Sequence, residues 1–210
     1  MIPKNYRYIT GQFSSPKGIG EDGFEAGLEP DFLTLAEFDP CVKAFEVRPC
    51  RVYWKDNLRK THRYTPDCRV IFNDVRRKPW IVEIKFRSFL AAHWSDLRPR
   101  YRAAVHSAAL EGSRFLIFTG KEIRTQYLEC AKFPLQFVRR GANESSTRRI
   151  FTQMREMKVT TPQHLMEHLS SDLQERALLL PALWHAIGTF QIKADLHVPL
   201  TMNSRIESLE

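Results

Sequence analysis

The sequence lacks the features that mark secreted, membrane-spanning and thiolate-metal proteins. Its four cysteines include no closely spaced pair of the zinc-knuckle or redox kind, so we expect buried, reduced thiols at Cys41, Cys50, Cys68 and Cys130. The first 20 residues contain no apolar segment typical of a secretory signal. No apolar run approaches the roughly 20 residues needed to span a bilayer. We therefore expect a soluble, intracellular protein.

The chain also lacks an excess of acidic residues, since 32 Lys and Arg outnumber 24 Asp and Glu and give a net charge of +8. Residues 1–130 hold 22 of the basic and 16 of the acidic residues, so most of the excess lies there. A positive excess favours a phosphate-bearing partner, because cationic side chains displace the counterions around nucleic acid. Charge alone does not establish such a partner.

The first two thirds of the chain predict an α/β domain. Residues 1–20 are polar and are interpreted as an N-terminal arm. Apolar residues at helical spacing predict a helix over 24–38, and a second helix is expected over 96–111. Runs rich in β-forming residues predict strands at 45–54, 69–72, 80–86 and 114–118. The resulting order is αβββαβ, in a domain that spans residues 21–138.

The remainder predicts a second, smaller domain over residues 139–210. A last strand of the first domain is expected at 134–138, followed by a polar linker at 139–146. Helices are expected at 147–157, 161–169 and 172–187, and two strands at 189–196 and 198–206. Three helices closed by a β-hairpin describe a winged-helix module.

The most informative polar pattern combines Asp67 with Glu83 and Lys85. Residues two apart on a strand share a face, so Glu83 and Lys85 point the same way. Carboxylates are the hard oxygen ligands that Mg²⁺ prefers. In phosphodiester hydrolysis one ion can activate a water and another can stabilise the leaving oxygen. The lysine can orient the water or offset charge on the transition-state phosphate.

A third acid, Glu29, lies at the border of the apolar stripe of the first helix, where a carboxylate is costly unless it is paired. Glu25 and Glu37 compete for the same role. The pattern is short and occurs by chance, so Glu83 and Lys85 are alternatively a solvated strand face. What favours a site is placement: the acids fall on a helix and two successive strands, followed by a helix and a strand. That order is similar to the PD-(D/E)xK endonuclease fold.

Four segments resemble TnsA, the endonuclease family of heteromeric cut-and-paste transposases. They are GLEPDFLTLAEFDP with Glu29, YTPDCRVIF with Asp67, IVEIKF with Glu83 and Lys85, and FLIFTGKEI at 115–123. The resemblance selects Glu29 over Glu25, which is kept as the fallback. It implies that Glu29, Asp67, Glu83 and Lys85 are catalytic, and that Glu29, Asp67 and Glu83 bind Mg²⁺ or Mn²⁺, with two ions expected.

The resemblance further implies a biological role. Such a subunit cleaves the 5′ ends of the transposon in double-stranded DNA, in the bacterial cytoplasm and at the nucleoid when assembled. Its expected partners are a DDE recombinase similar to TnsB and an AAA+ ATPase similar to TnsC, without a membrane. Two alternatives stay open: a non-catalytic DNA-binding or assembly protein with a nuclease-like fold, and a restriction or repair nuclease. Arg98, Arg100 and Arg102 are either DNA contacts or an exposed charged face.

Overall fold

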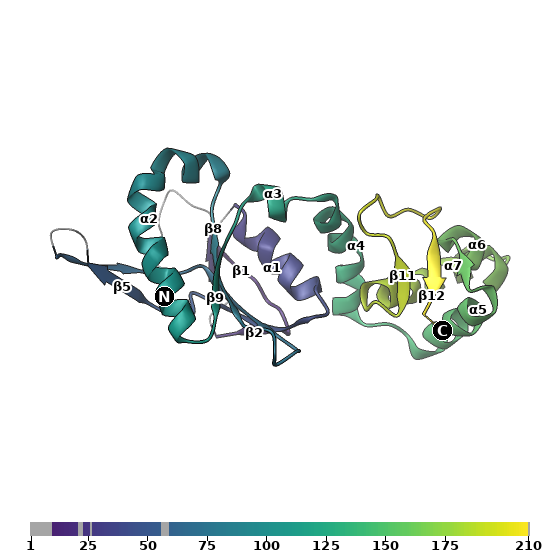
Figure 1. Cartoon of the computed structure of the whole chain (residues 1–210). Helices are drawn as coiled ribbons and strands as arrows, with labels where there is room; N and C mark the ends of the chain where they lie inside the picture. The colour runs from purple at the N-terminus through teal and green to yellow at the C-terminus, as the bar shows by residue number, and fades with distance from the viewer. Residues whose placement is uncertain (1–9, 21–22, 26, 56–58, 210) are drawn as a thin grey trace. The chain divides into compact units, whose positions relative to one another are not determined.

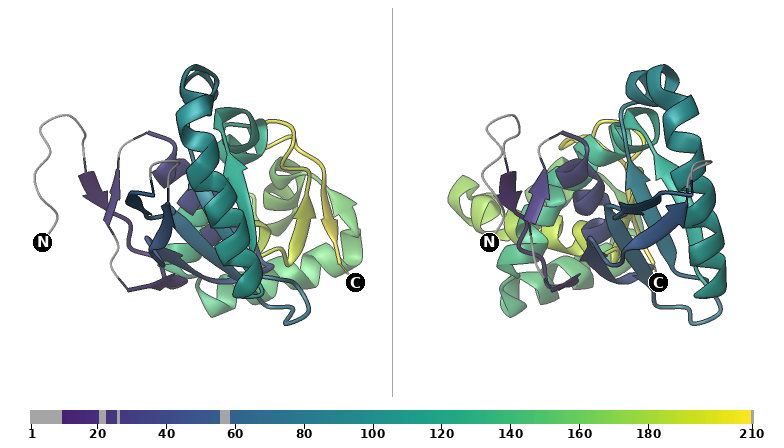
Figure 2. Two further views of the ribbon diagram at one scale, coloured as in Figure 1. Left: turned by 60° about the vertical axis from the view of Figure 1, so that its left-hand side comes forward. Right: turned by 90° about the vertical axis from the view of Figure 1, so that its left-hand side faces the viewer.

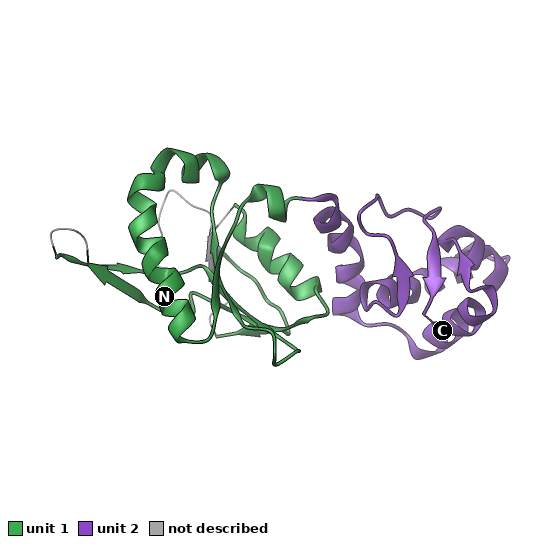
Figure 3. Cartoon of the chain, viewed as in Figure 1, with its two compact units in different colours: residues 1–124 green, residues 125–210 purple. Residues whose placement is uncertain are grey.

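The computed structural model describes residues 10–20, 23–25, 27–55 and 59–209. The chain divides into two compact units, residues 1–124 and 125–210, which Figure 1 and Figure 3 colour by position and by unit. In the described part of the chain, no helix is both long and apolar enough to cross a membrane.

The centre of unit 1 is a five-stranded mixed sheet in the order β2-β4-β7-β8-β9. The outer pairs β2–β4 and β8–β9 are parallel, and the inner pairs β4–β7 and β7–β8 are antiparallel. Inner strands bury apolar side chains on both faces because helices cover both faces. The strands are β2 (Gly18–Ile19), β4 (Val42–Val47), β7 (Cys68–Phe72), β8 (Trp80–Ile84) and β9 (Arg114–Phe118).

Two helices cover the opposite faces of this sheet, as Figures 1 and 2 show. Helix α1 (Glu29–Phe38) packs Phe32 against Phe118 of β9, with ring centroids 5.1 Å apart. Helix α2 (Arg87–Leu110) packs Tyr101 against Phe115 on the other face of the same strand, at 5.7 Å. A short helix, α3 (Gly120–Ile123), follows β9 and begins with a capping box between Thr119 and Glu122.

Two strand pairs lie outside the central sheet. Strands β1 (Thr10–Gln12) and β3 (Gly23–Glu25) pair antiparallel. Strands β5 (Val52–Lys55) and β6 (Thr61–Tyr64) form a separate antiparallel ribbon, which rests on α2 through a small apolar cluster.

Unit 2 has its own core, formed by helices and a small sheet in the order β10-β12-β11. Helices α4 and α7 approach so closely at Gly188 that an added Cβ would lie 2.6 Å from Cγ2 of Val138. The elements are α4 (Gln126–Arg140), α5 (Glu144–Met157), β10 (Val159–Thr160), α6 (Pro162–Leu169), α7 (Leu173–Gly188), β11 (Ile192–Ala194) and β12 (Ile206–Ser208).

The mixed α/β class is confirmed, but several predicted elements are wrong. The segment at 134–138 lies inside α4, because apolar residues at helical spacing pack that helix against α7 and override the β-forming side chains. The units therefore divide at residues 124/125, whereas the sequence placed the division after residue 138. The predicted strand at 45–54 is broken at Arg48, which adopts φ 53°, and at Pro49.

The interpretation of residues 1–20 as an arm is also wrong for the residues that the structure describes. Residues 10–12 and 18–19 form β1 and β2, and β2 extends the central sheet; residues 1–9 lie outside the described part. The first helix begins at Glu29, whereas Glu25 ends strand β3. All four cysteines are unpaired, but only Cys68 and Cys130 are buried.

Candidate active site

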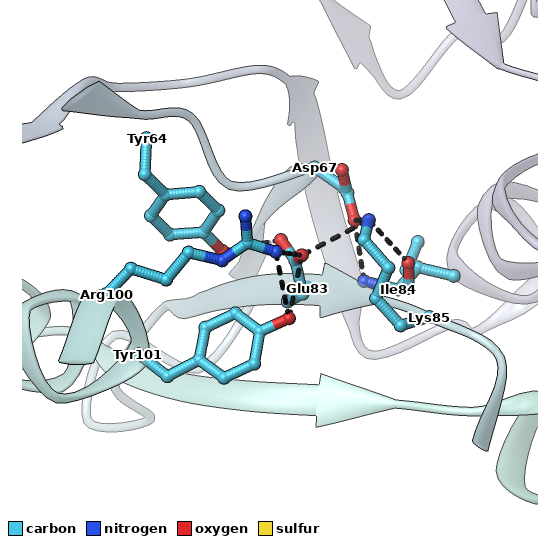
Figure 4. Close-up of polar contacts among 7 residues, drawn as sticks. All are labelled: Tyr64, Asp67, Glu83, Ile84, Lys85, Arg100 and Tyr101. Atoms are coloured by element: carbon cyan, nitrogen blue, oxygen red, sulfur yellow. Dashed lines mark hydrogen bonds and ion pairs between the residues drawn. The ribbon is translucent and has the colours of Figure 1, made fainter. Parts of the chain in front are cut away.

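Strand pairing brings Asp67 and Glu83 together. Strands β7 and β8 are antiparallel with Cys68 opposite Val82, so Asp67, one residue before β7, lies opposite Glu83. The amide of Asp67 donates to the carbonyl of Val82 at 3.0 Å, which continues the ladder to this point. Lys85 directly follows β8 on the same face as Glu83. Residues 16 positions apart in the sequence thus become neighbours at one end of two central strands (Figure 4).

Glu83 is a buried carboxylate, with 1% of its surface exposed. The hydroxyls of Tyr64 and Tyr101 donate to its two oxygens at 2.5 and 3.2 Å. The ammonium of Lys85 lies 3.1 Å from Oε1, and the guanidinium of Arg100 lies 3.6 Å from the same oxygen. An isolated buried charge would be very costly, so these donors and cations are what allows a carboxylate at this position.

Lys85 joins the two acids. Its Nζ lies 3.3 Å from Oδ2 of Asp67, 3.1 Å from Oε1 of Glu83 and 3.0 Å from the carbonyl oxygen of Ile84. Burial acts to lower the pKa of this ammonium, but the two carboxylates outweigh it and the pKa is raised. Lys85 is therefore a fixed positive charge at the meeting point of three oxygens.

Asp67 is the more accessible of the two paired acids, with 16% of its side chain exposed. Its Oδ2 accepts the amide of Ile84 at 2.6 Å and the ammonium of Lys85. Among the described residues no group bonds to Oδ1, which is available to a ligand. Burial, followed by the charge of Glu83, raises the pKa of Asp67 to about 7, against the opposing effect of Lys85.

Glu29 is the first residue of α1, and its charge contributes to the raised pKa of Asp67, so the two carboxylates interact. The competing acids fare differently. Glu37 is buried on α1 and acts on Lys17. Burial lowers the pKa of Lys17, and the charges of Asp39 and then Glu37 oppose this effect only in part. Glu25 is not on the helix, and its side chain lies outside the part that the structure describes.

Three partners of Glu83 were not identified as site residues from the sequence: Tyr64, Arg100 and Tyr101. The guanidinium of Arg100 lies 5.1 Å from the centroid of each tyrosine ring, which places it between them. Arg98 and Arg102 are exposed, so the arginines of this segment do not act as one charged face. The helical spacing of the buried residues Leu97, Tyr101, Ala104 and Ala108 was the signal that could have placed Tyr101 on the inner face.

The donor set fits a hard divalent cation. Asp67, Glu83 and the Ile84 carbonyl present oxygens that already converge on one cation, the Lys85 ammonium. No three His, Cys, Asp or Glu side chains within the described ranges form a metal cage by themselves. Mg²⁺ usually takes one or two carboxylates and completes its shell with water and substrate phosphates, so the oxygens of Asp67 and Glu83 suit such an ion.

The raised pKa of Asp67 predicts a pH-dependent stability in a chelating buffer. Unfolded Asp67 releases its proton near pH 4, whereas the folded protein holds it until about pH 7. The free energy of unfolding therefore falls across this window, because the folded state binds more protons. Asp67→Asn should remove this fall in the free energy of unfolding. The melting temperature of the variant should therefore exceed that of wild type by about 3 °C or more at pH 8, with little difference at pH 4. A difference that does not change with pH would contradict this.

Comparison with known proteins bears on part of the chain. Residues 39–120 match the TnsA-like endonuclease N-terminal domain. The matched range is less than half of the chain and includes Asp67, Glu83 and Lys85, whereas Glu29 lies before it. No curated protein matches the chain.

Proposed function

We propose that this chain is the metal-dependent DNA endonuclease subunit of a transposase of the TnsA family, because residues 39–120 match the TnsA-like endonuclease N-terminal domain. In this proposal it cleaves the 5′ ends of the transposon during cut-and-paste DNA transposition. The observation that carries the proposal is the contact of one ammonium, Lys85, with both Asp67 and Glu83 inside the matched domain. Acids and a lysine so placed are what metal-assisted phosphodiester hydrolysis requires.

We assign unit 1 to the PD-(D/E)xK fold. The support is topological: a helix covers each face of a mixed sheet, and the acids lie at the adjoining ends of the neighbouring strands β7 and β8. One fold hosts many activities, so the function follows from the site and not from this likeness.

Each residue has a distinct role in the proposed reaction. Asp67 and Glu83 would hold Mg²⁺ or Mn²⁺, with Glu29 contributing from α1 and two ions expected. When bound, the metal supplies Lewis-acid stabilisation of charge on the phosphate and its leaving oxygen. Tyr64 and Tyr101 fix the orientation of Glu83 through their hydroxyls. Lys85 holds positive charge beside the reacting phosphate and can orient the attacking water.

We assign unit 2 to the winged-helix class. Helices α5, α6 and α7 with strands β10, β11 and β12 follow one another in the order that such modules use, and β12 pairs with both other strands. Residues 125–210 carry 10 basic and 9 acidic residues, so this module suits a protein partner at least as well as DNA. The proposed partners are a TnsB-like recombinase and a TnsC-like ATPase. Co-purification with both tests this, and binding to neither would remove the assignment.

Metal-dependent nicking tests the proposed activity. The purified chain, alone and with the recombinase subunit, is incubated with transposon-end duplex in Mg²⁺, Mn²⁺ or a chelator. We expect strand cleavage only with a divalent ion and most strongly with the partner present. DNA binding without cleavage in every condition would instead favour a non-catalytic assembly protein. Cleavage that is indifferent to the transposon end and to the partner would favour a restriction or repair nuclease.

A further inference from the structure

The ribbon of β5 and β6 is a separate element of unit 1, and Figure 1 shows it projecting beyond α2. Residues 52–64 form no pairing with the five-stranded sheet among the described residues. An isolated two-stranded ribbon is marginally stable in water, so it depends on the contact with α2. That contact is made by Val52 and Tyr64, which are buried against Leu97, Tyr101 and Ala104.

The two faces of the ribbon differ in character. Strand alternation puts Val52, Trp54, His62 and Tyr64 on the face that packs toward α2, where Trp54 stacks on His62 at 5.1 Å. Tyr53, Lys55, Thr61 and Arg63 form the opposite face and are exposed, with 58% of Tyr53 accessible. The outer face therefore contributes nothing to the core.

The ribbon and the residues next to it carry a large share of the charge of the protein, and the outer face holds Lys55 and Arg63 of this set. Residues 51–63 contain five Lys or Arg and one Asp, a net charge of +4 against +8 for the whole chain. Arg51, Lys55, Arg59 and Arg63 are exposed, and none forms an ion pair with any residue that the structure describes. Concentrated positive charge on a narrow element is complementary to a polyanion.

The root of the ribbon is part of the candidate active site. Tyr64, the last residue of β6, donates its hydroxyl to Glu83, and Arg100 lies over its ring. At about 3.3 Å per residue, the cations at Arg63 and Lys55 follow within about 10 Å along the strands. These exposed cations of the ribbon therefore lie within about 10 Å, measured along the strands, of a residue that contacts Glu83.

We propose that the outer face of the β5–β6 ribbon binds the sugar-phosphate backbone of duplex DNA next to the bond that is cut. The inference rests on the proposed function for its choice of polyanion. A two-stranded ribbon is narrow enough to enter the major groove, which is about 12 Å wide. Its cations then reach phosphates, and the contact is independent of base sequence.

A charge-matched pair of variants tests the proposal. The ribbon variant carries Arg51→Ala, Lys55→Ala and Arg63→Ala. The control carries Lys43→Ala, Lys78→Ala and Arg114→Ala, which removes the same charge from exposed positions near the ends of β4, β8 and β9 that lie away from Glu83. Binding of the full chain to a duplex of about 30 base pairs is measured at several salt concentrations in a chelator, so that no cleavage occurs.

We expect the ribbon variant to lose at least about tenfold in affinity and the control to lose less than about threefold. The slope of log affinity against log salt concentration should become less negative by about 2 to 3 for the ribbon variant. Each phosphate contact that is lost removes about 0.9 from this slope. Equal losses in the two variants, or an unchanged slope, would overturn the proposal. Because no cleavage is needed, a chain that never cuts DNA still tests the ribbon. If the ribbon variant binds DNA as wild type does, the ribbon proposal fails. Nicking by the wild-type protein, and with it the proposed function, is unaffected by that result.

Discussion

The variant Asp67→Asn is expected to lose DNA cleavage by about a thousand-fold or more while it stays folded. The physical reason is the loss of one hard, negative ligand whose Oδ1 is available in the structure. In the proposed reaction several kcal/mol of transition-state stabilisation would depend on the bound cation, and each 1.4 kcal/mol is about tenfold in rate. Nicking rates and calorimetric titration with Mn²⁺ measure the two effects. Unchanged metal binding would remove Asp67 from the metal site.

The matched control is Asp74→Asn. Asp74 is an exposed aspartate beyond the opposite end of β7, where it pairs with Arg76 at 3.1 Å. It should leave cleavage and metal binding unchanged. Glu83 should behave as Asp67 does, but Glu83→Gln is the informative change there. Alanine would leave Tyr64, Tyr101, Lys85 and Arg100 around an empty space, so loss of folding would be confused with loss of chemistry.

Lys85→Ala is expected to lower the cleavage rate by about 100 to 1000 fold and to keep metal binding. The ammonium lies 3.0 to 3.3 Å from three oxygens, a position from which it can act on a phosphate but is not itself a metal ligand. Single-turnover cleavage at saturating DNA and metal measures the rate. Calorimetry with Mn²⁺ measures binding separately.

Two further variants sharpen this result. Lys85→Arg should not restore the rate, because a planar guanidinium does not fit the position of a compact ammonium. Lys78→Ala removes an exposed lysine from the turn before β8 and should cleave at the wild-type rate. If Lys85→Ala also cleaves at the wild-type rate, the lysine is only part of a strand face.

The shared orientation of Glu83 and Lys85 could be predicted from the sequence because it depends on a short-range rule. Glu83 and Lys85 share a face by strand alternation alone, and the structure places both in contact. That Asp67 lies opposite Glu83 depends on the register between β7 and β8, which the spacing could suggest but not determine.

The parts that were not predicted depend on tertiary packing. Tyr64 reaches Glu83 only because the ribbon of β5 and β6 folds back along α2, whereas the sequence predicted one strand over 45–54 and none at 61–64. Arg100 was weighed as an exposed cation, yet it lies between two tyrosine rings. Residues 134–138 have β-forming side chains but belong to α4, since contact with α7 decides their conformation. These long-range contacts cannot be predicted from local conformational propensity.

The strand specificity of cleavage tests the central claim most directly. Transposon-end duplex labelled on the strand whose 5′ end borders the element is incubated with the full chain, the recombinase and the ATPase. Products are mapped in Mg²⁺ and in a chelator. We predict a cut at the 5′ end of the element in Mg²⁺, absent in the chelator and absent with Asp67→Asn. Intact 5′ strands in Mg²⁺, in reactions where the recombinase has cut the 3′ ends, would contradict the assignment of this chain as the endonuclease.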